Sequence, residues 1–401
     1  MKKYYLTLLG LAGSLALISC GGSSSDSGGS VPDNPSGGSA QRIVVPADSA
    51  PMPADQRFSP SGDTVTDELT GLTWLDVSSQ GTWQDALNAV AALNTQNAGG
   101  HNDWRLPNRR ELFSLVDAGE ATGPVLTNGH PFTNILAGEY WTSTTSFNVQ
   151  ENPAPTPNSP AGTSAWVVDM DNGAVTTYVK YNTARVLYVR GASTVTDTYG
   201  VPQTGQTTCY DETGATGAAL GSCAGTGQDG DIKAGVEWPT SRFYANRVQS
   251  SGGADGTVTD TLTGLMWMTE ANCVQNKENL NDFAALGITN IDGGRVSWGD
   301  TVIFRDEFND NNINCDVVPD YRDWRLPTIR ELESLHSAGT SGPSLSNSDI
   351  FEHLVTDQYW SSTSSAVDPA AAWSVGFRHG YVENDAAQTS GHLVWLVRDV
   401  N

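Results

Sequence analysis

One stretch of the sequence, residues 306–316, concentrates oxygen-bearing side chains that could bind a metal ion. It has the sequence DEFNDNNINCD. The candidate ligands are Asp306, Asp310, Asn312, Asn314 and Asp316. Carboxylate and amide oxygens at alternating positions suit Ca²⁺, although the stretch lacks the glycine at position 6 and the glutamate at position 12 of an EF-hand loop. We therefore predict either a Ca²⁺ site, which would be the one cofactor that the sequence suggests, or a polar, solvated insertion.

A second candidate site is an aromatic pair that precedes hydroxyl residues and occurs twice. The pairs are Tyr140 with Trp141 in YWTST, and Tyr359 with Trp360 in YWSST. Aromatic faces pack well against the C–H faces of sugars, so each pair could bind a glycan. The alternative is a core strand with its two rings on opposite faces of a sheet, which leaves one of them pointing outward.

These pairs belong to a tandem duplication. The pentapeptide DWRLP occurs at residues 103–107 and again at residues 323–327. Further blocks recur in the same order, among them TGLTW with TGLMW before the pentapeptide and VLYVR with VWLVR after it. Matching blocks separated by insertions of different length are typical of a duplicated domain whose loops have diverged.

The duplication argues against catalysis. Two active copies would keep nucleophiles and bases at matched positions, but none of the six histidines faces a histidine in the other copy. The sequence also lacks GxSxG, P-loop and HExxH motifs. We therefore expect a protein that is not an enzyme, and the alternative is an envelope enzyme, active or degenerate.

The repeated pentapeptide fits a structural role at the start of a helix. Asn108 with Glu111, and Thr328 with Glu331, have the spacing of a capping box. We expect the tryptophan before the cap to fill the core, and the arginine to pair with the aspartate of the pentapeptide or the glutamate of the cap. The residues of this structural motif are Asp103, Trp104, Arg105 and Glu111, with Asp323, Trp324, Arg325 and Glu331.

The elements around the motif predict an α+β domain. A second helix is expected over Thr82–Asn94, where Trp83 and Leu87 share one face. The segments that follow, such as AWVVDM and VLYVR, have the length and composition of short strands joined by turns. Each copy should therefore contain two short helices and an antiparallel sheet.

The cysteines predict two disulfides in an oxidising compartment. Cys209, Cys223, Cys273 and Cys315 form an even set, and proximity in the sequence pairs Cys209 with Cys223 and Cys273 with Cys315. A zinc site is the alternative, but neither a CxxC pair nor the histidine spacing of such sites accompanies these cysteines.

The N-terminus predicts export and lipid anchoring. Lys2 and Lys3 precede an apolar run, Tyr4–Ile18, that ends in LISC at Cys20. This resembles a bacterial lipobox, in which the cysteine is diacylated; the alternative is a plain signal peptide. A Gly/Ser/Pro-rich tether follows at residues 21–57. By the same resemblance, Gly21 favours an outer-membrane lipoprotein of a Gram-negative bacterium, either periplasmic or surface-exposed.

The net charge limits the possible partners. At −24 it excludes nucleic acids as a bulk electrostatic partner, because those need stripes of Lys and Arg that this sequence lacks. We expect contact with the membrane through the lipid anchor, and a glycan or a protein as ligand.

The ordered set TGL[TM]W, DWRLPxxxEL, YW[ST]ST and a closing VR resembles the bacterial DUF1566 family, also named for the C-terminal domain of the Legionella collagen-like protein (Lcl_C). The resemblance places two such domains at residues 58–193 and 251–401, with a disulfide-closed linker at 194–250. It implies a C-type-lectin-like fold and a surface module for binding or adhesion. A degenerate enzyme related to the formylglycine-generating fold, or a purely structural envelope protein, is the alternative.

Overall fold

The computed structural model of the chain describes residues 52–147, 161–192, 199–213, 215–247, 252–276, 280–288, 291–313, 315–317, 321–340, 342, 344–345 and 348–400. The apolar run Tyr4–Ile18, the lipobox Cys20 and most of the tether lie outside these ranges, as does Asn314. Within them, no helix has the length and apolar character needed to cross a membrane.

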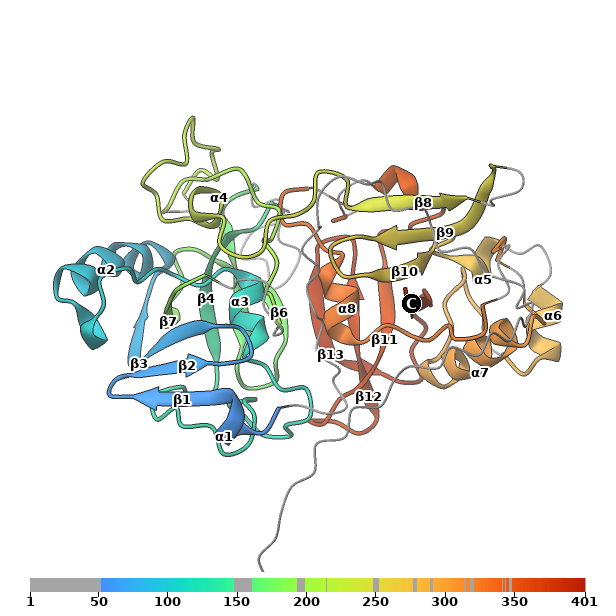
Figure 1. Ribbon diagram of the computed structural model, residues 1–401, viewed down its shortest axis with the longest axis horizontal. Helices are drawn as coiled ribbons and strands as arrows, with labels where there is room; N and C mark the ends of the chain where they lie inside the picture. Colours follow the sequence, from blue (N-terminus) through green and yellow to red (C-terminus); the bar gives the residue numbers. More distant parts are fainter. Residues whose placement is uncertain are drawn as a thin grey trace, which may run out of the picture. The chain divides into compact units, whose positions relative to one another are not determined.

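The first copy contains the two predicted helices and a set of short strands (Figure 1). Its elements are α1 (Ala54–Arg57), β1 (Phe58–Ser61), β2 (Thr64–Asp67), β3 (Leu72–Gly81), α2 (Trp83–Thr95), η1 (Ala98–Gly100), α3 (Arg109–Ser114), β4 (Glu139–Thr145), β5 (Ser164–Asp169), β6 (Val175–Val179) and β7 (Ala184–Arg190). Capping boxes begin both main helices: Thr82 with Asp85 begins α2, and Asn108 with Glu111 begins α3. The sequence therefore sets where each helix starts.

The second copy repeats these elements and adds helices. Its elements, after the connecting α4 (Asp229–Ile232), are β8 (Phe243–Arg247), β9 (Ala254–Asp260), β10 (Leu265–Met268), α5 (Cys273–Asn276), α6 (Leu280–Ala285), α7 (Trp298–Asn309), α8 (Ile329–Ser334), η2 (Ser348–Ile350), β11 (Gln358–Ser364), β12 (Ala371–Gly376), β13 (Tyr381–Ala387) and β14 (Val397–Asp399). The helices α5 and α6 lie in an insertion before α7, so this copy exceeds the two helices expected. The strand β8 pairs with β9, although its residues fall in the expected linker.

Both copies share one strand order. In the first it is β1-β2-β3-β7-β4-β5-β6, with antiparallel neighbours except for β4 and β7, which run parallel where Tyr140 meets Arg185. In the second, β8-β9-β10-β14 and β11-β12-β13 follow the same order, and a parallel bridge between Tyr359 and Leu393 stands in the matching place. The α+β class is confirmed, the parallel contact was not expected, and the C-type-lectin-like assignment stays a prediction.

The two copies join through equivalent strands. Strand β6 pairs with β13 in antiparallel orientation, and the paired residues are Val175 and Val382. These two valines occupy the same position in the repeat, two residues after the turn glycines Gly173 and Gly380. Pairing between identical positions is the pattern of an isologous dimer interface, here formed within one chain.

A reciprocal pair of arginines strengthens this junction. Arg110 donates hydrogen bonds to the carbonyl oxygens of Glu333, Ser334 and His336, at the end of α8. Arg330, at the matched position, donates to the carbonyl oxygens of Ser114 and Val116, at the end of α3. The last carbonyls of a helix have no partner within the helix and carry partial negative charge, so each arginine satisfies the other copy's helix end.

One side of the junction carries a buried ion pair that the other side lacks. Arg109, whose side chain is fully buried, lies 3.5 Å from a carboxylate oxygen of Glu333 and stacks over Trp166 at 4.0 Å. The matched positions, Ile329 and Phe113, are apolar and buried. Burial lowers the pKa of Arg109 to about 10, so this arginine stays cationic at neutral pH.

Candidate binding groove

The DWRLP motif holds each domain together through two ion pairs. Arg105 forms a two-pronged pair with the capping glutamate Glu111, with both N···O distances 2.7 Å. The repeat in the second copy is the same: Arg325 contacts Glu331 at 2.7 and 2.6 Å. Of the two acids considered from the sequence, the glutamate is therefore the partner of the arginine.

The aspartates of the motif pair with arginines that the sequence pattern did not predict as partners. Asp103 accepts from Arg190 at 2.6 Å, and Asp323 accepts from Arg398 at 2.7 Å. Both arginines belong to the closing VR block, which ties the end of each domain to its middle. The recurrence of VR together with DWRLP was the signal for this pairing.

The motif tryptophans are buried and fixed by an asparagine. The side-chain amide of Asn94 accepts from the N–H of Trp104 at 2.7 Å and donates to its carbonyl oxygen at 3.0 Å. Asn309 makes the same two bonds to Trp324. This link joins the end of α2 or α7 to the strand-like entry into the next helix.

The aromatic pairs do not form a sugar platform. Tyr140, Trp141, Tyr359 and Trp360 are all at most 3 % exposed, so the expectation that one ring of each pair points outward is wrong. The hydroxyl oxygens of Tyr140 and Tyr359 accept hydrogen bonds from the backbone N–H groups of Leu136 and Val355. The indole N–H groups of Trp141 and Trp360 donate hydrogen bonds to the carbonyl oxygens of Gly81 and Val296. Strand β4 is buried on both faces from Tyr140 to Thr145. Strand β11 is buried on both faces at Tyr359, Trp360 and Ser361, whereas Ser362 and Ser364 are exposed. The sequence pattern alone did not reveal this burial.

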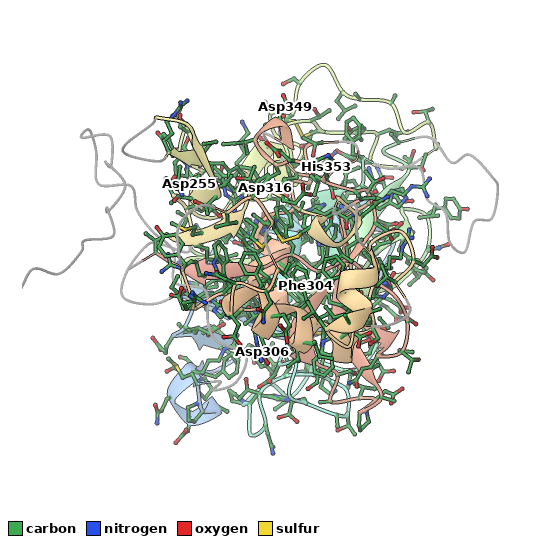
Figure 2. All side chains as sticks on the ribbon, turned by 90° about the vertical axis from the view of Figure 1, so that its right-hand side faces the viewer. Asp255, Phe304, Asp306, Asp316, Asp349 and His353 are labelled. Carbon is green, nitrogen blue, oxygen red and sulfur yellow. A yellow bond between two sulfur atoms is a disulfide. The ribbon has the colours of Figure 1, made fainter. Side chains whose placement is uncertain are left out.

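The oxygen-rich stretch of the second copy is not gathered around one point. Asp306 lies on α7 and pairs with Arg305, Asp310 ends that helix, and Asn312 donates to Glu307. Asp306 and Asp316 stand well apart in Figure 2. Asn314 lies outside the described residues. Helix α7 runs further into the stretch than a metal-binding loop would allow, so the ligand set Asp306, Asp310, Asn312 and Asp316 does not converge.

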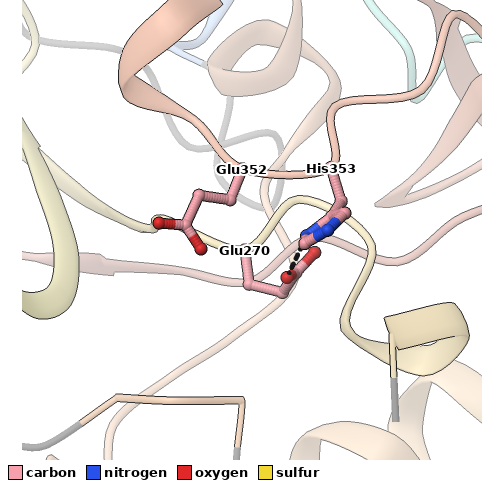
Figure 3. Close-up of side chains that lie close together, drawn as sticks. All are labelled: Glu270, Glu352 and His353. Carbon is pink, nitrogen blue, oxygen red and sulfur yellow. Dashed lines mark hydrogen bonds and ion pairs between the residues drawn. The ribbon is translucent and has the colours of Figure 1, made fainter. Parts of the chain in front are cut away.

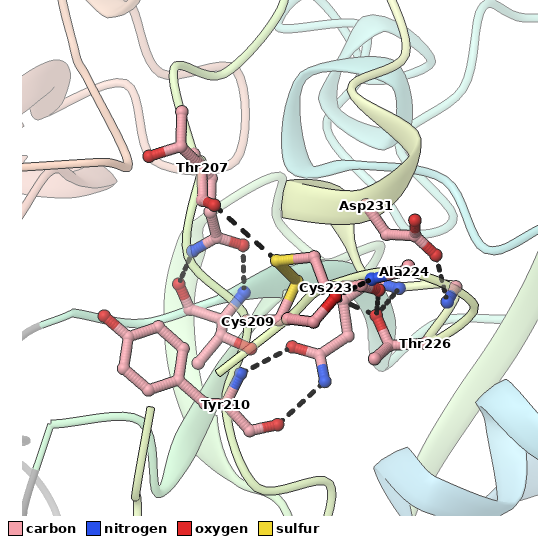
Figure 4. Close-up of a disulfide and its surroundings, with 12 residues drawn as sticks. Thr207, Cys209, Tyr210, Cys223, Ala224, Thr226 and Asp231 are labelled. Carbon is pink, nitrogen blue, oxygen red and sulfur yellow. Dashed lines mark hydrogen bonds between the residues drawn. A yellow bond between two sulfur atoms is a disulfide. The ribbon is translucent and has the colours of Figure 1, made fainter. Parts of the chain in front are cut away.

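Both predicted disulfides are confirmed. Cys209 bonds to Cys223 within the linker, and Cys273 on α5 bonds to Cys315 beyond α7. Around the first bond, the Thr226 hydroxyl donates to the Cys223 carbonyl oxygen, and the Asp231 carboxylate accepts from the N–H of Gly227 (Figure 4). The linker is therefore an ordered loop with its own hydrogen bonds.

A hollow of about 630 Å³ opens in the second copy between α7 and the DWRLP motif. We call it the copy-two groove. Its lining residues are Trp298, Thr301, Val302 and Arg305 of α7, Arg325, Leu326, Thr328 and Glu331 of the motif, Ser362 of β11 and Asp399 of β14. Its charges are largely compensated, because Arg325 contacts both Glu331 and Asp399, and Arg305 contacts Asp306.

In the first copy the chain itself covers the matching surface. The covering segment, residues 203–213 and 215–236, contains the Cys209–Cys223 disulfide and α4. The Asn108 side chain donates to the carbonyl oxygen of Ala234 at 2.9 Å, and the Thr144 hydroxyl donates to Asp229 at 2.7 Å. The side chain of Gln206 makes two bonds to the backbone of Thr145.

The exposure of matched residues differs accordingly. Trp83 is fully buried, whereas its counterpart Trp298 is partly exposed. Leu87 is 8 % exposed and Val302 is 40 % exposed. The side chain of Arg105 is 12 % exposed and that of Arg325 is 34 % exposed. The two copies therefore share one groove, which is covered in the first and open in the second.

Two buried charged groups lie where the covering segment meets the first copy. Burial raises the pKa of Asp229 to about 6, although the hydroxyl groups of Thr204 and Thr144 donate to its carboxylate and oppose the rise. Burial lowers the pKa of Lys180 to about 7; its ammonium group lies 4.0 Å from the Trp83 ring centre and donates to the Asp211 carbonyl oxygen.

Comparison with known proteins agrees with the internal repeat. The family model of the Lcl C-terminal domain matches residues 63–190 and again residues 256–398. No curated protein matches the sequence significantly. The two matched segments include both DWRLP motifs and the strands around them. The chain therefore belongs to the Lcl C-terminal domain family, with two tandem copies of the domain.

Proposed function

We propose that this chain is an exported, lipid-anchored binding protein without catalytic activity, and that its copy-two groove holds a polypeptide segment of a partner. The observation that carries the proposal is the state of the two grooves. The first is occupied by a polypeptide loop of this chain, and the second, built from the same elements, is open. A surface that accepts one loop is suited to accept another of similar chemistry.

The contacts in the first copy indicate what such a ligand offers. The covering segment presents a backbone carbonyl to Asn108, a side-chain amide to a strand edge and a carboxylate to Thr144. Gly227 lies beside Leu87 with a φ of +67°, a backbone conformation that favours glycine. In the second copy, hydroxyl groups of Thr328 and Thr363 stand at the positions of Asn108 and Thr144. Arg305 replaces Val90; it contacts Asp306 on the same helix, but its side chain stays 34 % exposed and can also meet a ligand carboxylate. A glycine-containing loop with an acidic residue, such as Asp229 in the first copy, therefore suits this groove.

The site residues support binding rather than catalysis. The charged residues Arg325 and Glu331 of the groove form the same ion pair as Arg105 and Glu111 in the first copy. This pair has a structural role in both copies. The family is one of bacterial surface or secreted proteins, which agrees with an export signal ending in Cys20 and a polar tether. We assign the lipid anchor to Cys20 and place the folded domains outside the cytoplasm, on an outer membrane.

A selection from a library of disulfide-closed peptide loops, displayed on phage, tests the proposal. We expect loops rich in glycine and acidic residues, with affinities in the micromolar range or better. Their binding should weaken at least tenfold in Val302→Arg and in Arg305→Ala. Val367→Arg is the matched control, because Val367 is as exposed as Val302 (45 % and 40 %) but lies outside the groove.

Two outcomes would overturn the proposal. One is that the enriched loops bind the groove variants as well as they bind the unchanged chain. The other is that no loop is enriched while a glycan panel shows saturable binding that Val302→Arg abolishes, which would make the groove a glycan site.

A further inference from the structure

Three side chains of metal-binding type converge in the second copy, away from the groove. They are Glu270, Glu352 and His353 (Figure 3). One ligand atom from each lies within 4.8 Å of those of the other two. In the described part of the chain, this is the group of three or more histidine, cysteine, aspartate or glutamate side chains whose ligand atoms lie close enough together to hold one metal ion. Figure 3 shows the Glu270 carboxylate against the His353 ring, with the Glu352 carboxylate nearby on the left of the view.

The backbone holds these residues side by side. Glu270 and Glu352 form a parallel bridge, in which the N–H of Ala271 donates to the carbonyl oxygen of Glu352 at 2.9 Å and the N–H of Glu352 donates to that of Thr269 at 2.8 Å. Three residues after Glu270, Cys273 enters the disulfide with Cys315. Two distant parts of the chain are thus fixed against each other at the cluster.

The side chains combine a buried anchor with two adjustable ligands. The Glu270 side chain is 3 % exposed, and its carboxylate accepts from Nδ1 of His353 at 2.6 Å and from the N–H of Asn272 at 3.0 Å. The His353 side chain is 54 % exposed, and Glu352 is exposed. In a tetrahedral zinc site the ligand atoms lie roughly 3.3 Å apart, since each sits about 2.0–2.2 Å from the ion. Rotations of the two exposed side chains can close the remaining distance.

The first copy shows that the fold does not require this set. The matched residues are Val77, Thr133 and Asn134. There, Asp76 accepts from the backbone N–H groups of Thr133 and Asn134 and fixes the same loop without a histidine or a glutamate. Only the second copy has residues of metal-binding type at all three positions.

We propose that Glu270, Glu352 and His353 form a site for a divalent transition-metal ion of the zinc class. One imidazole and two carboxylates are typical zinc ligands, whereas Ca²⁺ prefers oxygen ligands alone. With three protein ligands, a tetrahedral ion keeps a fourth position open to water or to a side chain of another molecule. The site is independent of the copy-two groove and of the peptide binding proposed for it.

Zinc titration of the full-length chain, after treatment with a chelator, tests this proposal. Calorimetry should show one equivalent of Zn²⁺ bound, and zinc should raise the melting temperature. The double variant Glu352→Thr/His353→Asn installs the residues of the first copy. Asparagine tolerates the positive φ of 50° at position 353. We expect it to bind Zn²⁺ at least tenfold more weakly and to lose the zinc-dependent thermal shift.

The controls separate this site from adventitious binding. His101→Ala removes a histidine outside the cluster and should leave the zinc affinity unchanged. Because Glu352 and His353 are exposed, circular dichroism should show the double variant folded in the absence of zinc. The proposal is overturned if the unchanged chain shows no zinc binding at micromolar concentrations, or if the double variant binds zinc as tightly as the unchanged chain.

Discussion

At the scale of single residues, the repeated motif is a set of electrostatic contacts with different degrees of exposure. Arg105 and Arg325 make the same pair with their glutamates, but Glu111 is fully buried and the covering segment shields the first pair. The second pair lines the open groove. Water screens an exposed pair and leaves a buried one strong, so equal geometry implies unequal contributions to stability.

We therefore expect Arg105→Ala to destabilise the chain more than Arg325→Ala. Removal of Arg105 leaves a buried carboxylate without its cation and should cost about 3 kcal/mol or more. Removal of Arg325 should cost less, about 1–2 kcal/mol, because the Arg325 side chain is 34 % exposed and the pair lines the open groove. Urea unfolding of each variant measures the difference, and equal losses would show that exposure of the pair does not control its contribution.

A second prediction at this scale concerns Asp229. Its pKa in the folded chain, about 6, lies above the ordinary value of 3.8. Between these pH values the folded state holds a proton that the unfolded state has lost, so stability falls as the pH rises from about 4 to 6 and stays lower above that. Asp229→Asn should remove this part of the pH dependence, as judged from melting temperatures at pH 4.5 and 7.5. An unchanged difference between the two pH values would contradict the assignment.

At the scale of elements, insertions distinguish the copies. The Cys209–Cys223 bond closes a loop that covers the first copy, and the Cys273–Cys315 bond ties α5 to the segment after α7 in the second. Capping boxes, strand order and the asparagine clamp on the motif tryptophan are common to both. The shared elements maintain the fold, and the disulfide-closed segment after the first copy covers one groove and leaves the other open.

The two disulfides should have different consequences when removed. The residues that they join are 14 and 42 positions apart, and loop-closure entropy assigns about 3 and about 4 kcal/mol to such crosslinks. Cys273→Ser/Cys315→Ser should increase amide hydrogen exchange in the second copy. Cys209→Ser/Cys223→Ser should do so in the covering segment and in α2. Exchange that increases equally everywhere would contradict this division.

At the scale of the described part of the chain, the two copies act as one unit through an internal pseudo-dimer junction. The β6–β13 pairing is short, so the arginine contacts to the helix ends and the buried pair of Arg109 with Glu333 contribute much of the contact. A buried arginine without its acid is strongly unfavourable. Coupling between the copies therefore depends on Glu333, which also contacts Arg110.

We expect Glu333→Ala to destabilise the chain by about 3–5 kcal/mol and to weaken the cooperativity between the copies. Calorimetry should then show a broadened or split transition in place of a single one. Glu237→Ala, at an exposed position, is the control and should change neither. A sharp single transition at the original temperature in Glu333→Ala would show that this junction does not couple the copies.

The sequence by itself determined the local and repeated features. Capping spacing set the helix starts, block order revealed the duplication, and cysteine proximity paired the disulfides. These features depend on residues that are neighbours in the sequence, or on a comparison of the chain with itself. The amphipathic pattern of α2 likewise predicted its buried face, with Trp83 and Leu87.

Only the tertiary structure decided which surfaces are buried and which distant residues meet. The alternation in YW[ST]ST is the same for a half-exposed and a fully buried strand, so the burial of Tyr140 and Tyr359 could not be predicted. The groove, the arginine exchange and the cluster at His353 join segments separated by tens to hundreds of residues. Such contacts depend on how the sheet pairs and where the insertions fold back, and the sequence pattern of a single segment does not contain that information.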